Sequence, residues 1–145
     1  MSESAEIHQK AEYRFEVRFG GGMPPLHVDE PPPLGEGTGP SPVQLLAAAV
    51  GNCLSASLYF AIRKFHQSPE PIHAVVEPEV GRNADKRLRV LAMRVRMTLG
   101  VPAAKIEHLD RALERFEEFC TVTASVRQSI PVSVAVFDSA GLRLK

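Results

Sequence analysis

The feature that most constrains the fold is a long apolar segment that carries its own helix start signal. Ser41 suits the N-cap position, Pro42 suits the first helical position, and Gln44 completes a Ser-x-x-Gln capping box. Apolar and small residues then continue to about Phe65, and they cover every face of the segment between residues 45 and 49. The pattern therefore predicts one long helix that begins at Pro42 and is buried on several sides.

The segment before this helix predicts a strand, a hairpin and a loop. Residues 11–19 alternate strictly between apolar and charged side chains, which is typical of a half-buried antiparallel strand. Three consecutive glycines, residues 20–22, indicate a hairpin into a short strand at 26–28. Residues 29–42 are rich in proline and glycine, so we expect an ordered loop rather than a helix or a central strand.

Two further strands and a second helical region are predicted after the long helix. Residues 72–80 and 87–99 indicate strands joined by a turn at 82–85. A second helix is expected from about Pro102, with one apolar stripe, and residues 121–128 are expected to add a helical turn or two. Residues 131–136 alternate again and indicate a closing strand. The stripe consists of Ile106, Leu109, Leu113, Phe116 and Cys120.

Short hairpins that flank helices favour an α+β fold, in which antiparallel sheets pack around two core helices. With 145 residues, the chain fits one domain, residues 1–145.

Charge and composition restrict the classes of partner. Lysine plus arginine equals aspartate plus glutamate at 17 each, so the formal charge gives no attraction to nucleic acid or to an anionic membrane. The N-terminal residues are acidic and polar, unlike a secretory signal. The longest uninterrupted apolar run, Leu45 to Val50, is too short to span a bilayer. We therefore expect a cytoplasmic protein without a membrane or nucleic-acid partner.

The two cysteines are the candidate reactive residues. Cys53 lies on the long helix and Cys120 ends the stripe of the second helical region, so both thiols are predicted to point toward the interior. If the two sulfurs meet, they can form a redox pair. Free cysteine also behaves as a small buried hydrophobe, so the pattern alone leaves two inert core cysteines as an alternative.

Metal and hydrolase sites have little support in the sequence. The five histidines show no ligand spacing with one another or with the cysteines, so no metal site is expected. A Cys–His hydrolase stays open in principle because such partners meet only in the folded chain, but no local signature indicates one.

Two segments resemble the OsmC/Ohr family. Residues 39–53, Gly-Pro-Ser-Pro-Val-Gln-Leu-Leu-Ala-Ala-Ala-Val-Gly-Asn-Cys, are similar to the family helix that carries its peroxide-reactive cysteine. Residues 120–127 and 130–132 are similar to its second-cysteine segment. The resemblance implies an intertwined homodimer that acts in oxidative-stress defence as a thiol-dependent, peroxiredoxin-like peroxidase on organic hydroperoxides or hydrogen peroxide. Cys53 would be the peroxidatic residue and Cys120 the resolving one. An external thiol would be the reductant, with no metal or organic cofactor.

One position departs from the family pattern. Peroxidases of this family carry a glutamate directly after the proline that opens the helix, where this chain has Val43. In the family that carboxylate works with an N-terminal arginine, for which Arg18 is the nearest candidate, although a solvated strand face also explains Arg18. Glu30 or Glu36 can supply a loop carboxylate, and Arg127 a positive potential near Cys120, although each also fits an ordinary surface position. The departure favours the alternative of a non-catalytic relative that binds a small ligand or senses oxidants.

Overall fold

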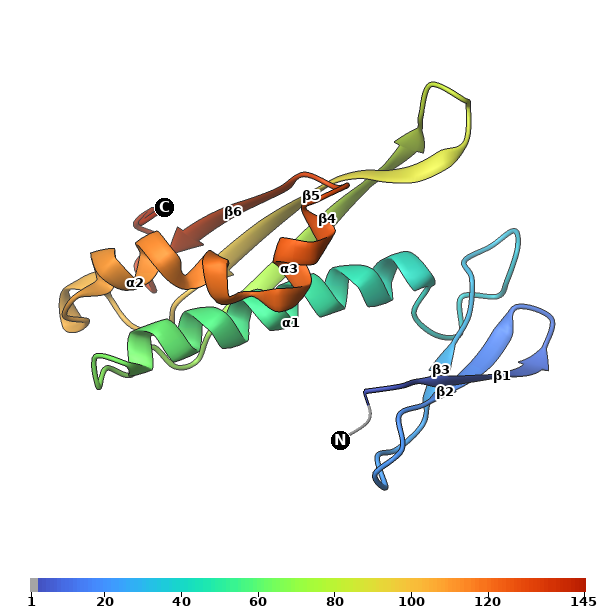
Figure 1. Ribbon diagram of the computed structural model, residues 1–145, viewed down its shortest axis with the longest axis horizontal. Helices are drawn as coiled ribbons and strands as arrows, with labels where there is room; N and C mark the ends of the chain where they lie inside the picture. Colours follow the sequence, from blue (N-terminus) through green and yellow to red (C-terminus); the bar gives the residue numbers. More distant parts are fainter. Residues whose placement is uncertain (1–2) are drawn as a thin grey trace. The chain divides into compact units, whose positions relative to one another are not determined.

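A computed structural model describes residues 3–145 as two compact units (Figure 1). The first unit ends at Leu46 and the second runs from Ala47 to Lys145. The long helix contributes its first turn to the first unit and the remainder to the second.

The first unit contains an antiparallel sheet of three strands in the order β1-β2-β3. The strands are β1 (Glu6–Ala11), β2 (Arg14–Arg18) and β3 (Leu26–Val28). The predicted strand at 11–19 corresponds to β2, but it is shorter, because Glu12 adopts a positive φ of 53° and turns the chain back onto β1. β1 was not predicted, since five of its six residues are exposed and it lacks an apolar alternation.

The proline-rich segment after β3 is an ordered loop, as predicted, and one buried carboxylate organises it. Asp29 is only 2% exposed. Its Oδ1 accepts a hydrogen bond from the backbone N–H of Glu30 at 2.8 Å. Its Oδ2 accepts bonds from the N–H of Glu36 and from both the N–H and the hydroxyl of Thr38, at 2.8–3.2 Å. These donors replace the solvation that the carboxylate loses on burial.

The long helix α1 (Pro42–Arg63) begins where the sequence predicts. The capping box is formed in both directions: the Ser41 N–H donates to Gln44 Oε1 at 2.9 Å, and the Gln44 N–H donates to Ser41 Oγ at 3.2 Å. The prediction of burial on several sides is wrong for the single chain. Only one face is buried, whereas Tyr59 and Phe60 on the other side are 40% and 54% exposed.

By length and mean hydropathy alone, α1 would be able to cross a membrane. The uninterrupted apolar run from Leu45 to Val50 is too short to span a bilayer, whereas the helix as a whole includes an 18-residue window of mean hydropathy 1.7. Of that window, 39% is buried within the fold, and the core helix of a soluble protein passes the same test.

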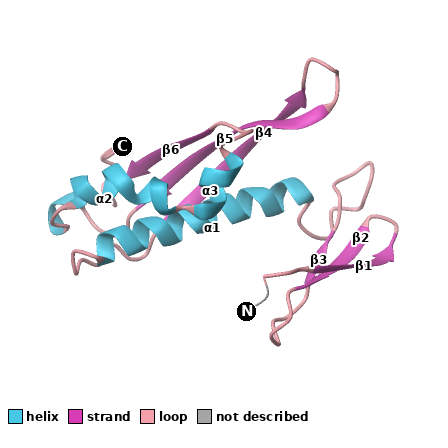
Figure 2. Cartoon of the chain, in the orientation of Figure 1, coloured by secondary structure: helices cyan, strands magenta, loops and turns pink. Residues whose placement is uncertain are grey.

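The second unit contains a mixed sheet with strand order β4-β5-β6. β4 (His73–Arg82) and β5 (Leu88–Thr98) form an antiparallel hairpin, which extends beyond the helices of this unit (Figure 2). β6 (Val132–Phe137) pairs with β5 in parallel, which corrects the expectation of purely antiparallel sheets. The face of β5 that carries Met93, Val95 and Met97 is buried.

The second helical region is not one continuous helix, contrary to the prediction. It consists of the 3-10 turn η1 (Ala103–Lys105), the helix α2 (Leu109–Arg115), the 3-10 turn η2 (Phe116–Phe119) and the helix α3 (Thr121–Val126). Ile106 is extended and His108 has a left-handed φ of 59°, so the chain breaks before α2. The apolar stripe is nevertheless buried throughout. The helices α1, α2 and α3 lie on one side of the mixed sheet (Figure 1).

Candidate active site

The first predicted site residue, Cys53, lies within α1 at the edge of its buried face. It is a free thiol of intermediate exposure. Gly51, two residues earlier, is buried where α1 approaches β4, and a Cβ built on it would lie 2.7 Å from Val76 Cγ2. The missing side chain thus allows the α1 backbone to pack closely on β4.

The second predicted site residue, Cys120, is fully buried at the junction of η2 and α3. Its exposure is 0%. Its pKa is raised, first by burial and then by interaction with the neighbouring Cys53 side chain. The fold therefore brings together the two thiols that the sequence separates by 67 positions. A buried thiol with a raised pKa remains protonated, and so unreactive, until something draws its proton away.

Sequence reasoning missed a third residue of this cluster, Thr123. Its side chain is 0% exposed, and the Cys120 thiol donates a hydrogen bond to Thr123 Oγ1 at 2.9 Å. The Thr123 hydroxyl and backbone N–H both lower the pKa of Cys120, against the larger effect of burial. The available signal was the spacing: a residue three positions after the start of a helix lies over its first turn.

Arg127 belongs to a structural ion network. It forms an ion pair with Glu117, which also pairs with Lys145. The Arg127 guanidinium also donates two hydrogen bonds to the Val132 carbonyl, at 2.9 and 3.2 Å. Burial opposes ionisation of Glu117, but the hydrogen bonds and charges of Lys145 and Arg127 outweigh it and lower the pKa of this carboxyl. The arginine thus links η2, α3 and β6.

The remaining candidates, Arg18, Glu30 and Glu36, lie in the first unit. Arg18 donates a hydrogen bond to Glu16 Oε1 at 2.6 Å, and this bond lowers the pKa of Glu16. Glu36 pairs with Arg14 at 3.9 Å, whereas Glu30 contributes its backbone N–H to the Asp29 loop. Arg18 and Glu36 thus have ion partners inside their own unit.

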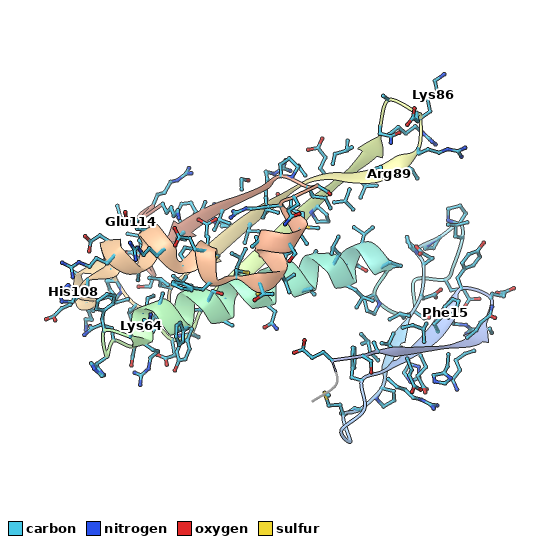
Figure 3. The ribbon with its side chains drawn as sticks, in the orientation of Figure 1. Phe15, Lys64, Lys86, Arg89, His108 and Glu114 are labelled. Carbon is cyan, nitrogen blue, oxygen red and sulfur yellow. The ribbon has the colours of Figure 1, made fainter. Side chains whose placement is uncertain are left out.

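A hollow in the second unit lies farther along α1, and neither cysteine lines it. Its volume is about 390 Å³. Lys64, directly after α1, and Glu114 of α2 line it and are labelled in Figure 3. The Lys64 ammonium lies 5.2 and 5.3 Å from the ring centres of Phe60 and Phe119. Within residues 3–145, no group of three or more histidine, cysteine, aspartate or glutamate side chains is placed to hold a metal ion.

Comparison with known proteins agrees with the fold. The family model described as "OsmC-like protein" matches residues 35–135, a range that includes both cysteines. No curated protein matches the chain in sequence.

Solved structures of similar fold cover nearly the whole chain. One is a Psychrobacter arcticus protein named for osmotic stress induction and a detoxification response, with 18% identity, 94% of this chain and 96% of that chain covered, and a TM-score of 0.79. Organic hydroperoxide resistance proteins of Legionella pneumophila and Elizabethkingia anophelis are 19% and 16% identical, with TM-scores of 0.70 and 0.72. In both comparisons 94% of this chain and 96% of the other are covered. At these identities the likeness shows a shared fold.

Proposed function

Because the chain belongs to the OsmC-like protein family, we propose that it is a thiol-dependent peroxidase that reduces organic hydroperoxides through a Cys53–Cys120 redox pair. The observation that carries the proposal is the interaction between the two thiols, one partly exposed and the other fully buried. Similar proteins of two organisms are named for organic hydroperoxide resistance.

The chemistry proceeds in two steps. The Cys53 thiolate attacks the outer peroxide oxygen, the O–O bond breaks, an alcohol leaves, and Cys53 becomes a sulfenic acid. The Cys120 thiolate then attacks the Cys53 sulfur, the S–O bond breaks, and the departing hydroxide takes up a proton to form water. One hydroperoxide and two thiols thus yield one alcohol, one water and one disulfide, which an external thiol reduces again.

The difference in environment supports the assignment of the two roles. A peroxide must reach the first sulfur from solvent, and Cys53 is the partly exposed thiol. Cys120 has no exposed surface and a raised pKa, so it is unsuited to make the first attack. Its interaction with the Cys53 side chain supports a role in capturing the sulfenic acid of Cys53.

The proposal includes the partners that the family resemblance implies. These are a second copy of the chain in a homodimer, a hydroperoxide substrate and a dithiol or other external thiol as reductant. A reducing cytoplasm would keep both thiols available between turnovers. No metal, organic cofactor, membrane or nucleic acid has a part in the reaction.

The test is to follow both thiols after one equivalent of cumene hydroperoxide. We expect the wild type to form an intramolecular Cys53–Cys120 disulfide, detected by mass spectrometry of non-reduced peptides. Cys120→Ser should instead accumulate a Cys53 sulfenic acid that a dimedone probe traps. Cys53→Ser is the matched control and should consume no peroxide. If both wild-type thiols stay reduced over hours, the peroxidase proposal is wrong.

One observation favours a second function, that of a non-catalytic relative that binds a small ligand or senses oxidants. Val43, at the second position of α1, is half-buried and apolar where related peroxidases place a carboxylate. Without that carboxylate the thiolate of Cys53 lacks one activating group. A chain whose thiols stay reduced in peroxide but whose melting temperature rises with an added small apolar ligand would support this function.

A further inference from the structure

Thr123 is a buried polar side chain whose hydrogen-bond partner is the Cys120 sulfur. Both side chains have 0% exposure, and the S–O distance is 2.9 Å. A buried hydroxyl needs a hydrogen-bond partner, and a thiol is an unusually weak one. A valine has the same shape and would fill this space without needing a hydrogen-bond partner. The presence of a hydroxyl here therefore suggests a function for it.

The hydroxyl can serve both protonation states of the cysteine. In the reduced protein the Cys120 S–H donates to Thr123 Oγ1. A hydroxyl oxygen is both donor and acceptor, and its hydrogen rotates to suit its neighbour. When Cys120 loses its proton, the same oxygen can turn its O–H toward the sulfur, and a hydrogen bond to a charged acceptor is stronger than one between neutral groups.

The need for such a donor follows from the surroundings of Cys120. Burial disfavours the thiolate, and the neighbouring Cys53 side chain disfavours it further. The groups that act in the other direction are the hydroxyl and the backbone N–H of Thr123. Arg127 is paired with Glu117. The threonine is therefore the side chain that stabilises the negative charge at this sulfur.

We infer that Thr123 is the positioning residue of the resolving thiol: its hydroxyl aims the Cys120 sulfur at Cys53 and turns its hydrogen toward that sulfur when the thiolate forms. This inference rests on the proposed peroxidase function and assigns a residue to its second step. In that step the Cys120 sulfur forms the S–S bond, the S–O bond of the Cys53 sulfenic acid breaks, and water leaves. Thr123 neither gains nor loses a proton in the overall reaction.

The test compares Thr123→Val with Thr123→Ser, which keeps the hydroxyl. Thr121→Val is the matched control, since Thr121 is exposed in the same short helix. The first readout needs no peroxide: the ¹³Cβ chemical shift of Cys120 is followed against pH in a Cys53→Ser background. At a fixed pH below the midpoint, we expect about tenfold less thiolate in Thr123→Val, because a hydrogen bond to a charged group is lost. Thr123→Ser and Thr121→Val should titrate like their parent.

The second readout is a single turnover with cumene hydroperoxide. We expect Thr123→Val to form the Cys53 sulfenic acid at the wild-type rate but the disulfide about tenfold more slowly, in line with the smaller thiolate fraction. Thr123→Ser should restore the second rate. An unchanged Cys120 titration in Thr123→Val, or failure of Thr123→Ser to restore it, would overturn the inference. If wild-type Cys53 resists peroxide, the proposed function fails, whereas the titration still decides the role of Thr123.

Discussion

At the scale of single residues, Asp29 shows how one side chain fixes a loop that has no regular structure. The hydrogen bonds that it accepts, first from the Thr38 backbone, lower the pKa of its carboxyl from 3.8 to about 2, although burial acts in the opposite direction. A lowered pKa means that the folded state prefers the ionised form. The contribution of Asp29 to stability is therefore complete above about pH 4 and is lost as the pH falls toward 2.

The corresponding prediction concerns Asp29→Asn. An amide cannot accept as many hydrogen bonds from the loop, so the variant should melt below the wild type at pH 7. The difference should shrink between about pH 4 and pH 2, where wild-type Asp29 itself becomes protonated. Thermal unfolding at several pH values measures it. Asp85→Asn, at an exposed hairpin position, should show no such pH-dependent difference. A constant difference down to pH 2 would argue against this role.

Whether a side-chain contact could be predicted from the sequence depends on how close its partners lie along the chain. The capping box of Ser41 and Gln44 was predicted from the sequence and is formed as written, because both partners lie within one helical turn. The burial of Cys120 was predicted from the apolar stripe. The bond between Thr123 and the thiol was not predicted, since a threonine near a helix start most simply caps backbone groups. The polar contacts of Arg127 join three elements, and no local pattern indicates such contacts.

At the scale of elements, Glu117 is the point where η2, α3 and the C-terminal residue are joined. It is largely buried and pairs with both Arg127 and Lys145. Glu117→Gln removes the charge and leaves two cations beside a neutral amide, so we expect a loss of about 1–2 kcal/mol in the free energy of unfolding. Glu118→Gln is the matched control, because Glu118 is the exposed neighbour, and it should change stability by less than about 0.5 kcal/mol. Urea denaturation measures both values, and equal effects would contradict the prediction.

The contact between α1 and β4 gives a second prediction at this scale. In Gly51→Ala the new Cβ would lie 2.7 Å from Val76 Cγ2, so the helix or the strand must shift. We expect a loss of about 1–2 kcal/mol, because the cost of overpacking exceeds the gain in helix propensity. In a Val76→Ala background the space is free, and Gly51→Ala should be neutral or stabilising by up to about 1 kcal/mol. The double-mutant cycle by urea denaturation tests this reversal, and additive effects would disprove the contact.

The elements themselves were predictable to different degrees. α1, the β4–β5 hairpin and β6 have clear periodicity and lie where the sequence places them. β1 was not predicted because an exposed edge strand needs no apolar face. The break before α2 was not predicted because an apolar stripe can continue across a residue in the left-handed conformation, such as His108. The parallel pairing of β6 with β5 is a property of the chain path, which residue patterns do not encode.

At the scale of the whole molecule, exposed apolar surface on α1 bears on the proposed homodimer. Tyr59 and Phe60 are exposed on the side of the helix away from its buried face, together with Ala48, Ala49 and Ala56. The residue pattern of α1 predicts burial on several sides, and a second copy of the chain would cover the exposed side. The homodimer stays a proposal, because it concerns how two copies of the chain associate. The single domain of residues 1–145 also stays a proposal, because it concerns how the two units of one chain associate.

The last prediction tests this cover directly. If α1 lies in a dimer interface, Phe60→Glu places a charge in an apolar contact and should weaken association at least tenfold, with the measured mass shifting toward that of one chain in sedimentation equilibrium. Leu142→Glu is the matched control: Leu142 is also exposed, at 59% against 54% for Phe60, but it lies near the C-terminus, outside α1. It should leave association unchanged. If Phe60→Glu and the wild type sediment alike, whether as dimers or as monomers, the exposed face of α1 does not mediate dimerisation.

A weakened dimer that also forms the Cys53–Cys120 disulfide more slowly would show that association supports the thiol chemistry. A monomer with an unchanged rate would show that each chain carries a complete redox pair.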